Sequence, residues 1–473
     1  MAPERLSPLD ASFLAVETPA AHMHVGWAAV FSPPEDGAGL PTFAELRAHV
    51  AARLDRAPRY RQRLEPVPLG LHAPEWVDDP DFDLDHHVRH AVCADLDGLV
   101  DAVMSAPLPR ERPLWQFWIA DGLDDGRLAL VGKAHHCMVD GVAAVELGSL
   151  LLDLGAERPP LGRSRRFARA ADEVAAAATD LTDPPREALD VLVSGMAGRI
   201  ADQARVARGS LRALSHPRSA VDGATRMART LAEAALPPAA GSILNGRTSP
   251  HRHLARLTRR LADLREVRTR YSGTTVNDVL LAAVAGGLRS FLLERGEDPA
   301  SLKAMVPVSV RADGEALGNR ISFIFVRLPV DEPDPVVRLM LCHRQTAVAK
   351  RRGAPGDADA ALHALGYAPR TVQRLFSSLV SHPRMFNLTV SNIPGPRPPV
   401  YLRGCRLEAV WPVVPLADGH GLAVGMTTVR DTACLGLYAD AKAFPDADGL
   451  ADHVDLAFDE LRDTARSADP VLS

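Results

Sequence analysis

The feature that most constrains the fold is a change of pattern that occurs twice along the 473-residue chain. Residues 6–155 alternate short apolar runs with helical periodicities, and the same alternation resumes from about 241. The stretch between them, 162–238, is rich in Ala and Arg, and prolines interrupt its helical periodicity. We therefore predict an N-terminal αβ domain over 1–160, a helical crossover over 161–240 and a C-terminal αβ domain over 241–473.

The apolar runs and periodicities assign individual elements in both predicted domains. The first domain is expected to hold strands over 25–31 and 128–133 and helices over 43–54 and 96–105. The second is expected to hold a helix from Asn277 capped by Thr274 or Thr275, strands over 304–311, 321–328 and 386–392, a hairpin of 422–429 and 433–438, and a closing helix over 450–462. Pro307 places its strand near an edge or a bulge.

Composition and charge are those of an ordinary globular protein, with 47% hydrophobic and 24% charged residues. A net charge of −5 means that the chain has no overall excess of basic residues of the kind that nucleic-acid binding requires. The five cysteines are scattered and form no CxxC pair, which favours reduced thiols in a cytosolic protein. The first residues lack the pattern of a signal peptide, and no uninterrupted apolar run is long enough to span a bilayer. We expect a cytoplasmic protein without a nucleic-acid partner.

The strongest chemical signal is an HHxxxDG motif, formed by His135, His136, Asp140 and Gly141. The residues before it resemble a buried strand, and those after it are rich in helix formers, with Asp140 and Gly141 placed to start the helix. The two histidines are therefore predicted on a strand-to-helix turn. Imidazole, with an ordinary pKa of about 6.5, can accept a proton and return it at neutral pH. We expect Asp140 to orient the ring or to fix the turn.

Other interpretations of this motif stay open. The histidine pair can be structural, HxxxD can supply two ligands of a metal site, and Cys137 can be a nucleophile paired with a histidine. No further cluster with zinc-like spacing stands nearby, and His22 and His24 do not supply one. Adjacent residues on an extended segment point to opposite sides, which disfavours the pairing of Cys137 with its neighbour. We predict no metal site.

The predicted crossover is basic. Between Arg186 and Arg229 it holds eight arginines and four acidic residues, a local charge of +4. Amphipathic helices with basic faces can lie on an anionic membrane. A solvated pair of linker helices packed on the body is an equal alternative, and both descriptions can hold for one segment.

Several separate motifs, in the same order along the chain, resemble those of the bacterial wax ester synthase/diacylglycerol acyltransferases of the actinobacterial triacylglycerol synthase kind. The matching pieces are LSPLDASFL at 6–14, MHVG at 23–26, PLW at 113–115, HHCMVDG at 135–141, NDVL at 277–280, VPVSVR at 306–311, GN at 318–319 and SNIPGP at 391–396. HHxxxDG alone is shared with peptide-synthetase condensation domains, so the whole set carries the specificity. Cys137-Met138-Val139 stands where the family often has Ala-Leu-Val. These are the three variable positions of HHxxxDG, so the departure does not weaken the resemblance.

The resemblance implies an α/β fold like that of chloramphenicol acetyltransferase, with two similar mixed-sheet domains and a tunnel between them. It also implies transfer of a fatty acyl group from acyl-CoA, as co-substrate and without another cofactor, to diacylglycerol or a long-chain alcohol. The expected location is the cytoplasm, peripherally on the inner membrane or on lipid droplets. Two alternatives are a condensation-type acyltransferase that uses carrier-protein thioesters and a non-enzymatic lipid-droplet protein.

The resemblance also implies roles for particular residues. His136 is the expected general base, and His135 supports the turn. Asp140 is expected to form a salt bridge with Arg311, although an exposed Arg311 at a strand end is the alternative. Candidate oxyanion donors are Asn277, Ser391 and Asn392. Asn277 can instead be a helix cap, and Ser391 and Asn392 can instead form a turn. Trp115 is assigned to the substrate-binding region, where its motif Pro113-Leu114-Trp115 is expected to pack the core near the tunnel rather than to touch the chemistry.

Overall fold

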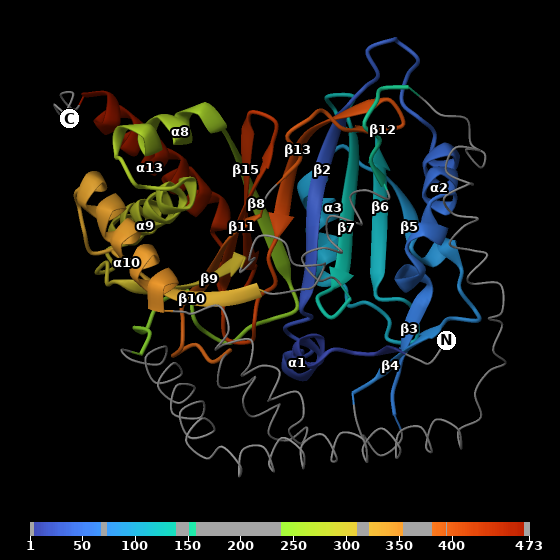
Figure 1. Ribbon diagram of the computed structural model, residues 1–473, viewed down its shortest axis with the longest axis horizontal. Helices are drawn as coiled ribbons and strands as arrows, with labels where there is room; N and C mark the ends of the chain where they lie inside the picture. Colours follow the sequence, from blue (N-terminus) through green and yellow to red (C-terminus); the bar gives the residue numbers. More distant parts are fainter. Residues whose placement is uncertain are drawn as a thin grey trace.

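A computed structural model describes residues 4–67, 73–138, 151–157, 238–309, 321–352, 381–393 and 395–467. Two six-stranded sheets lie beside each other, and each carries its own helices (Figure 1). The chain runs through the first sheet, crosses to the second, and returns once to the first before it ends.

The first sheet has the order β12-β13-β2-β7-β6-β5. Its strands are β2 (His24–Ser32), β5 (Val88–Val92), β6 (Trp115–Asp121), β7 (Leu128–His135), β12 (Tyr401–Leu402) and β13 (Cys405–Val413). Around it lie α1 (Pro8–Val16), α2 (Phe43–Ala51), α3 (Leu96–Ser105), and 3-10 turns at Leu54–Arg56, Pro58–Arg61 and Leu84–His86. A small sheet of β1 (Glu4–Arg5), β4 (Glu75–Asp78) and β3 (Gln62–Glu65) completes this half. Every residue of β7 is buried, as expected for a central strand.

The second sheet has the order β10-β9-β11-β14-β15-β8. Its strands are β8 (Arg252–Arg260), β9 (Leu302–Ser309), β10 (Ile321–Leu328), β11 (Leu388–Ile393), β14 (Leu422–Val429) and β15 (Thr432–Asp440). β11 runs parallel to both of its neighbours and the other pairs are antiparallel, so the sheet is mixed. Helices α8 (Leu261–Arg270), α9 (Val276–Glu294), α10 (Pro335–Arg352) and α13 (Ala447–Ser467) gather on the side away from the first sheet (Figure 1).

The long helix α9 forms the centre of the second hydrophobic core. Thr275 caps it in a capping box with Asp278, and its residues from Asp278 to Leu288 are buried without interruption. By length and composition α9 is the one helix in the described ranges that could cross a membrane, but 72% of its apolar window is buried inside the protein. Its apolar character is therefore explained by the core, where a helix that is hydrophobic on all sides is expected.

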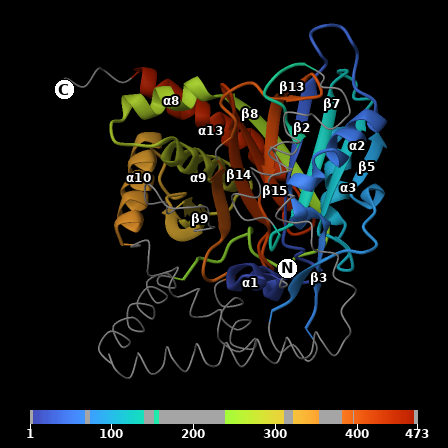
Figure 2. The ribbon, with the colours of Figure 1, turned by 45° about the vertical axis from the view of Figure 1, so that its right-hand side comes forward.

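One strand from the second half of the sequence belongs to the first sheet. β13 pairs antiparallel with β2 from Arg406↔Ser32 to Val413↔Gly26, with an irregularity between Leu407 and Ala409. Figures 1 and 2 both show β13 beside β2, at the boundary between the two sheets. The predicted division at 160 and 240 therefore does not separate the two sheets, because the predicted C-terminal domain supplies β12 and β13 to the sheet of the N-terminal one.

The predicted elements of the described ranges are present. The helix over 96–105 and the strand over 321–328 have the predicted bounds, and Arg430, at φ 53°, forms the turn of the predicted hairpin. Pro307 lies in β9, which is not an edge strand but pairs with β11 only at Ala304 and Met305. The backbone of Pro307 therefore faces β10 alone, which explains how the sheet accepts it. The helices expected over most of the crossover lie outside the described residues.

Candidate active site

His135 and His136 lie where β7 ends. The N–H of His135 donates to the carbonyl of Leu114 at 2.9 Å, and the N–H of Met138 turns back to the carbonyl of His135 at 2.9 Å. The N–H of His136 donates to the carbonyl of Met23 at 2.9 Å, just before β2 begins. The strand and the turn predicted for the two histidines are confirmed, and the helix expected to follow lies outside the described residues apart from its end.

The His136 ring lies against α1. It stacks on Phe13 with ring centroids 3.7 Å apart and planes inclined by 18°. Ser7 caps this helix and Pro8 is its first residue, so the SPLD portion of the LSPLDASFL motif is a helix start that presents Phe13. His136 is partly exposed as a residue, but its Nδ1 is buried with no partner among the described groups. Burial lowers the pKa of His136 to about 4, so the ring is neutral at pH 7.

His135 is buried and held in one tautomer. Its Nδ1 accepts a hydrogen bond from the N–H of Cys137 at 3.1 Å, which leaves the proton on Nε2. That Nε2 lies 3.8 Å from Oε1 of Glu17, whose carboxylate pairs with Arg110. Burial, and then the positive charge of Arg110, hold the pKa of His135 well below its usual value. His135 is thus built into the turn through Nδ1, while its buried Nε2 faces Glu17 without a hydrogen bond among the described groups.

The thiol of Cys137 cannot act as a nucleophile in this arrangement. The residue is 3% exposed, and burial raises the pKa of its thiol far above the usual value. Among the described residues no group of three or more His, Cys, Asp or Glu side chains is placed to hold a metal ion. The metal alternative from the sequence also involves Asp140, which lies outside the described residues.

Two further histidines stand behind the turn. His24 pairs with His135 across β2 and β7, and the His22 and His24 rings are 5.2 Å apart. Both nitrogens of His24 and Nδ1 of His22 are buried without a partner among the described groups. Burial, and then the charge of Lys133, keep the pKa of His24 well below the usual value. These atoms border a cavity with room for about one water molecule, lined by His22, Met23, His24, Arg252, Leu416 and Tyr438.

Lys133 fixes β7 two residues before the histidines. Its buried ammonium donates to the carbonyls of Val103 at 2.6 Å and Ala106 at 2.8 Å, at the end of α3. Burial lowers its pKa to about 8. Both acceptors are carbonyls at the end of a helix, where no N–H of the helix is available to pair with them. The Lys133 side chain therefore joins the strand to the helix without breaking a hydrogen bond of the helix.

The candidate oxyanion donors lie in the second half. Asn277 is the second residue of α9, partly exposed, on the helical side of the second sheet. Ser391 is buried in β11 opposite Gly425, and Asn392 is exposed opposite Met426. No hydrogen bond or ring contact between described residues joins any of the three to His135 or His136. Their assignment to the oxyanion remains a prediction.

Trp115 is a core residue, so its assignment to substrate binding needs correction. It is 1% exposed, its indole N–H donates to the carbonyl of Tyr60 at 2.8 Å, and its ring stacks on His87 at 4.6 Å. A buried indole with its single donor satisfied has no surface left for a substrate. Three predicted site residues, Asp140, Gly141 and Arg311, lie outside the described residues, so the salt bridge expected between Asp140 and Arg311 remains a prediction.

The structure adds three groups to the site that the sequence did not assign. Phe13 covers the His136 ring, the Met23 carbonyl fixes its backbone, and Glu17 faces His135. Phe13 and Met23 belong to the quoted motifs at 6–14 and 23–26, which supported the family resemblance but did not indicate what either residue does. Nothing in the local pattern around Glu17 distinguishes it from a solvated acidic residue.

Comparison with known proteins gives a consistent result across the chain. Residues 6–280 match the family model of the wax ester synthase/diacylglycerol acyltransferase catalytic domain, and 317–462 match that of the C-terminal domain. A probable diacylglycerol O-acyltransferase of Mycobacterium tuberculosis is 32% identical over 470 residues, covering 96% of this chain and 95% of the relative. A relative from Mycobacterium bovis has the same identity and coverage.

Solved structures support the predicted fold. The wax ester synthase/diacylglycerol acyltransferase of Marinobacter aquaeolei is 26% identical with a TM-score of 0.67, over 98% of this chain and 100% of that one. The first condensation domain of the calcium-dependent antibiotic synthetase has a TM-score of 0.58 over 100% of this chain and 98% of that one, and its 16% identity shows likeness of fold alone. The predicted mixed α/β fold of two units is confirmed by these similarities.

Proposed function

Because the chain belongs to the wax ester synthase/diacylglycerol acyltransferase family, and is therefore an acyltransferase, we propose that it moves a long-chain fatty acyl group from acyl-CoA to the hydroxyl of diacylglycerol or of a long-chain alcohol. The observation that carries the chemistry is His136, a neutral and partly exposed imidazole on the turn that ends β7. Acyl-CoA is the co-substrate, and the reaction needs no other cofactor.

His136 acts as the general base through Nε2, because Nδ1 is buried. An alcohol is a weak nucleophile at pH 7 and needs a base as it attacks. The alcohol oxygen bonds to the thioester carbonyl carbon while its proton moves to Nε2. The tetrahedral intermediate then collapses, the carbon–sulfur bond breaks, and the imidazolium returns the proton to the CoA thiolate. The products are the ester and free CoA, so atoms and charge balance without an acyl-enzyme.

Burial of His136 has two opposing effects on this step. A pKa of about 4 keeps the ring fully deprotonated at neutral pH, which a base requires. The same low pKa makes the ring a weak base in the free protein, since catalytic efficiency rises as the pKa approaches the working pH. Direct transfer between two substrates held together supplies the compensating gain, because well-oriented reactants react as if at about 10⁵–10⁸ M.

The charge that develops on the thioester oxygen needs hydrogen-bond donors. Ser391, Asn392 and Asn277 stay the candidates for this role, as the motifs of the family imply. Loss of one donor of this kind typically lowers kcat by about 10²–10³-fold. Asp140 and Arg311 are proposed to support the turn as an ion pair.

The decisive experiment measures CoA release from palmitoyl-CoA by the purified protein, with dioleoylglycerol or hexadecanol as acceptor. We expect release that depends on the acceptor, is lost in His136→Ala, and is partly retained in His135→Asn, which preserves an acceptor and a donor in the turn. The ratio of the two acceptors identifies the preferred product. No release from folded wild-type protein with either acceptor would contradict the proposal and favour a carrier-protein thioester as the donor.

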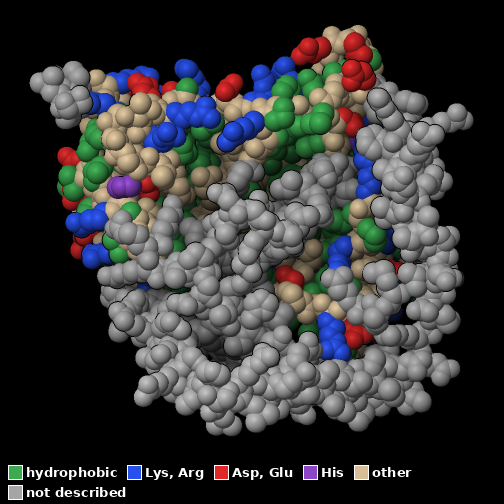
Figure 3. Space-filling view, in the orientation of Figure 1, with side chains coloured by type: hydrophobic (Ala, Val, Ile, Leu, Met, Phe, Trp, Pro, Cys, Tyr) green, Lys and Arg blue, Asp and Glu red, His purple; other side chains and the backbone are tan. Residues whose placement is uncertain are grey.

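We further propose that the protein works at the surface of a membrane or lipid droplet, because its acceptors are insoluble in water. Basic side chains along the upper rim of the face in Figure 3 have acidic side chains among them. Arg259 pairs with Asp455 and Asp459, and Arg466 pairs with Glu266. The electrostatic support for this proposal therefore comes from the basic crossover predicted over 161–240, most of which lies outside the described residues.

Flotation with liposomes tests the membrane proposal. We expect the protein to float with vesicles that contain anionic lipid at low salt and to be released as salt screens the attraction. Neutral vesicles of the same size serve as the control. Failure to float with anionic vesicles at low salt would remove the electrostatic version of the proposal.

A further inference from the structure

A short segment between α1 and β2, residues 17–23, holds the histidine turn from one side. The carbonyl of Met23 accepts from the N–H of His136 at 2.9 Å, and Oε1 of Glu17 lies 3.8 Å from Nε2 of His135. Met23 has a positive φ of 51°, which non-glycine residues seldom adopt and which holds only where surrounding contacts impose it. The position of this segment therefore decides where the histidines stand.

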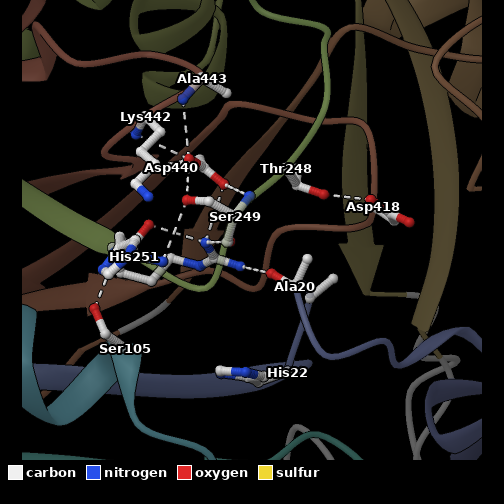
Figure 4. A network of polar contacts seen from close by, with 12 residues as sticks. Ala20, His22, Ser105, Thr248, Ser249, His251, Asp418, Asp440, Lys442 and Ala443 are labelled. Atoms are coloured by element: carbon white, nitrogen blue, oxygen red, sulfur yellow. Dashed lines mark hydrogen bonds and ion pairs between the residues drawn. The ribbon is translucent and has the colours of Figure 1, made fainter.

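A contact from the other half of the protein fixes the middle of this segment. Arg252, at the start of β8 in the second sheet, donates from Nη2 to the carbonyl of Ala20. Its Nη1 donates to Asp440 at 3.2 Å, so the guanidinium joins two residues that Figure 4 shows in one network of polar contacts, Ala20 and Asp440. Arg252 is 4% exposed, so this contact crosses a buried boundary between the halves, where a charged hydrogen bond is strong.

Asp440 orients the guanidinium. This carboxylate is fully buried and accepts from the N–H of Ser249 at 2.5 Å, Lys442 at 2.9 Å and Ala443 at 3.0 Å, and from Nη1 of Arg252 at 3.2 Å. Burial alone would raise the pKa of Asp440, but the hydrogen bonds outweigh burial and hold it below the usual value. The acid therefore stays ionised and the arginine cannot turn away from Ala20.

Arg252 is also anchored through its backbone. The N–H of Arg252 donates to the Ser105 hydroxyl at 2.8 Å, at the end of α3 in the first half. Lys133 binds the same end of α3 and lies two residues before His135 in β7. Arg252 thus contacts the first half at Ala20 and at Ser105. Ala20 lies in the segment that leads into β2, and Ser105 ends the helix that Lys133 joins to β7.

We propose that Arg252, oriented by Asp440, is a positioning residue for the acyl transfer: it fixes the carbonyl of Ala20 and, through residues 17–23, the place of His136. This inference rests on the proposed role of His136 as the base. It makes the second half of the protein a supporting part of the histidine site, although no hydrogen bond or ring contact between described residues joins a side chain of that half to His136. A base displaced by about 1 Å costs about 10²-fold in rate, so Arg252 acts on kcat.

The test compares two conservative variants of the full-length protein. Arg252→Lys keeps the charge beside Asp440 but lacks the planar fork that reaches two acceptors at once. Arg256→Lys is the matched control, because Arg256 lies on the same strand and also joins the halves, through Asp97 at 2.6 Å, without a described contact to residues 17–23. We expect Arg252→Lys to lower kcat about 10–100-fold with KM for palmitoyl-CoA changed less than about twofold, and the control to leave both within about twofold.

Amide hydrogen exchange supplies a readout that does not depend on activity. In Arg252→Lys we expect faster exchange in peptides that contain 17–24 and 133–138, including the His136 amide, and unchanged exchange in the control. If Arg252→Lys does not fold, Asp440→Asn replaces it, because the amide oxygen can still accept from the N–H groups of Lys442 and Ala443, whereas the NH2 in place of Oδ2 no longer accepts from the guanidinium. Should wild-type protein lack acyl transfer, the proposed function fails, whereas the exchange comparison still decides the positioning.

The results that would overturn the inference are specific. A kcat for folded Arg252→Lys within twofold of wild type would do so, as would an equal loss of kcat in Arg256→Lys. A loss confined to KM would assign Arg252 to substrate binding. Unchanged exchange at His136 in the folded variant would show that the segment 17–23 holds its place without Arg252.

Discussion

The stack of Phe13 on His136 leads to a quantitative prediction about pH. The ring of Phe13 covers one face of the imidazole at 3.7 Å and contributes to the burial that lowers the pKa of His136 to about 4. With that pKa about 97% of the imidazole is free base at pH 5.5, whereas with the ordinary pKa of about 6.5 only about 9% would be. We therefore expect wild-type kcat/KM to be nearly equal at pH 5.5 and pH 7.5.

Phe13→Ala should admit water to that face and move the pKa of His136 upward. If the pKa returned fully to about 6.5, activity at pH 5.5 relative to pH 7.5 would fall about tenfold, and a partial return gives a smaller fall. The assay is acceptor-dependent CoA release at closely spaced pH values from 5 to 8, with circular dichroism at each pH to confirm folding. Phe43→Ala is the control, because Phe43 stacks on His90 at 4.9 Å in the same half, outside the histidine turn.

Two outcomes would refute this reasoning. A wild-type profile with its acid limb near pH 6.5 would show that His136 is hydrated in the working protein, or that another group is the base. A Phe13→Ala profile that matches wild type in shape, with lower activity at every pH, would show that the aromatic ring places the imidazole without setting its pKa.

Three further predictions concern stability and specificity. Hydrogen bonding to Asp101 raises the pKa of His253 to about 9. Because the folded pKa exceeds the unfolded value, protonated His253 stabilises the fold by about 1–2 kcal/mol after allowance for solvent screening; this contribution is complete below pH 6.5 and is lost as the pH rises through 9. His253→Gln should therefore flatten the fall of the unfolding temperature between pH 6 and 10. Gly132→Ala should lower stability by about 1–3 kcal/mol, because a Cβ there would overlap the Trp27 ring, and thermal unfolding measures the loss. Trp115→Phe should cost about 1–3 kcal/mol by removing the hydrogen bond to the Tyr60 carbonyl and part of a fully buried side chain, with the acceptor ratio in the CoA-release assay unchanged.

Each of these predictions has an outcome that contradicts it. An unchanged pH dependence of unfolding in His253→Gln would remove the proposed ion-pair contribution. Gly241→Ala is the control for the glycine prediction, since nothing lies within 4 Å of a Cβ at that position, and equal losses in both variants would point to a backbone effect. A changed acceptor ratio with unchanged stability in Trp115→Phe would restore that residue to the substrate site.

Local elements of the fold could be predicted because their signals are local. The helix at 96–105 has an aspartate cap before an apolar stripe, and Thr275 stands three residues before Asp278 in the pattern of a capping box. The register of β13 could not be predicted in this way. The choice of β2 as its partner depends on packing between residues about 380 positions apart in the sequence.

The same distinction applies to the site. The turn that bears His135 and His136 follows from a buried run and a motif that adjoin in the sequence. The contacts that tune these residues are distant in sequence: Phe13 reaches His136 from the first helix, and Arg252 reaches Ala20 from the other sheet. Trp115 shows the converse, because the core packing expected of its motif is present, while its partners Tyr60 and His87 could be identified only from the structure.

The return of β13 to the first sheet has a consequence for how the protein is made. During synthesis β2 leaves the ribosome early, but its neighbour on one side is translated only after most of the second half. Until then β2 is an open edge that can pair with other chains, a recognised route to aggregation. An N-terminal fragment that ends before 400 should therefore be poorly soluble when expressed alone and should improve when a fragment with the missing strand is co-expressed, because the two halves share one sheet and mature together.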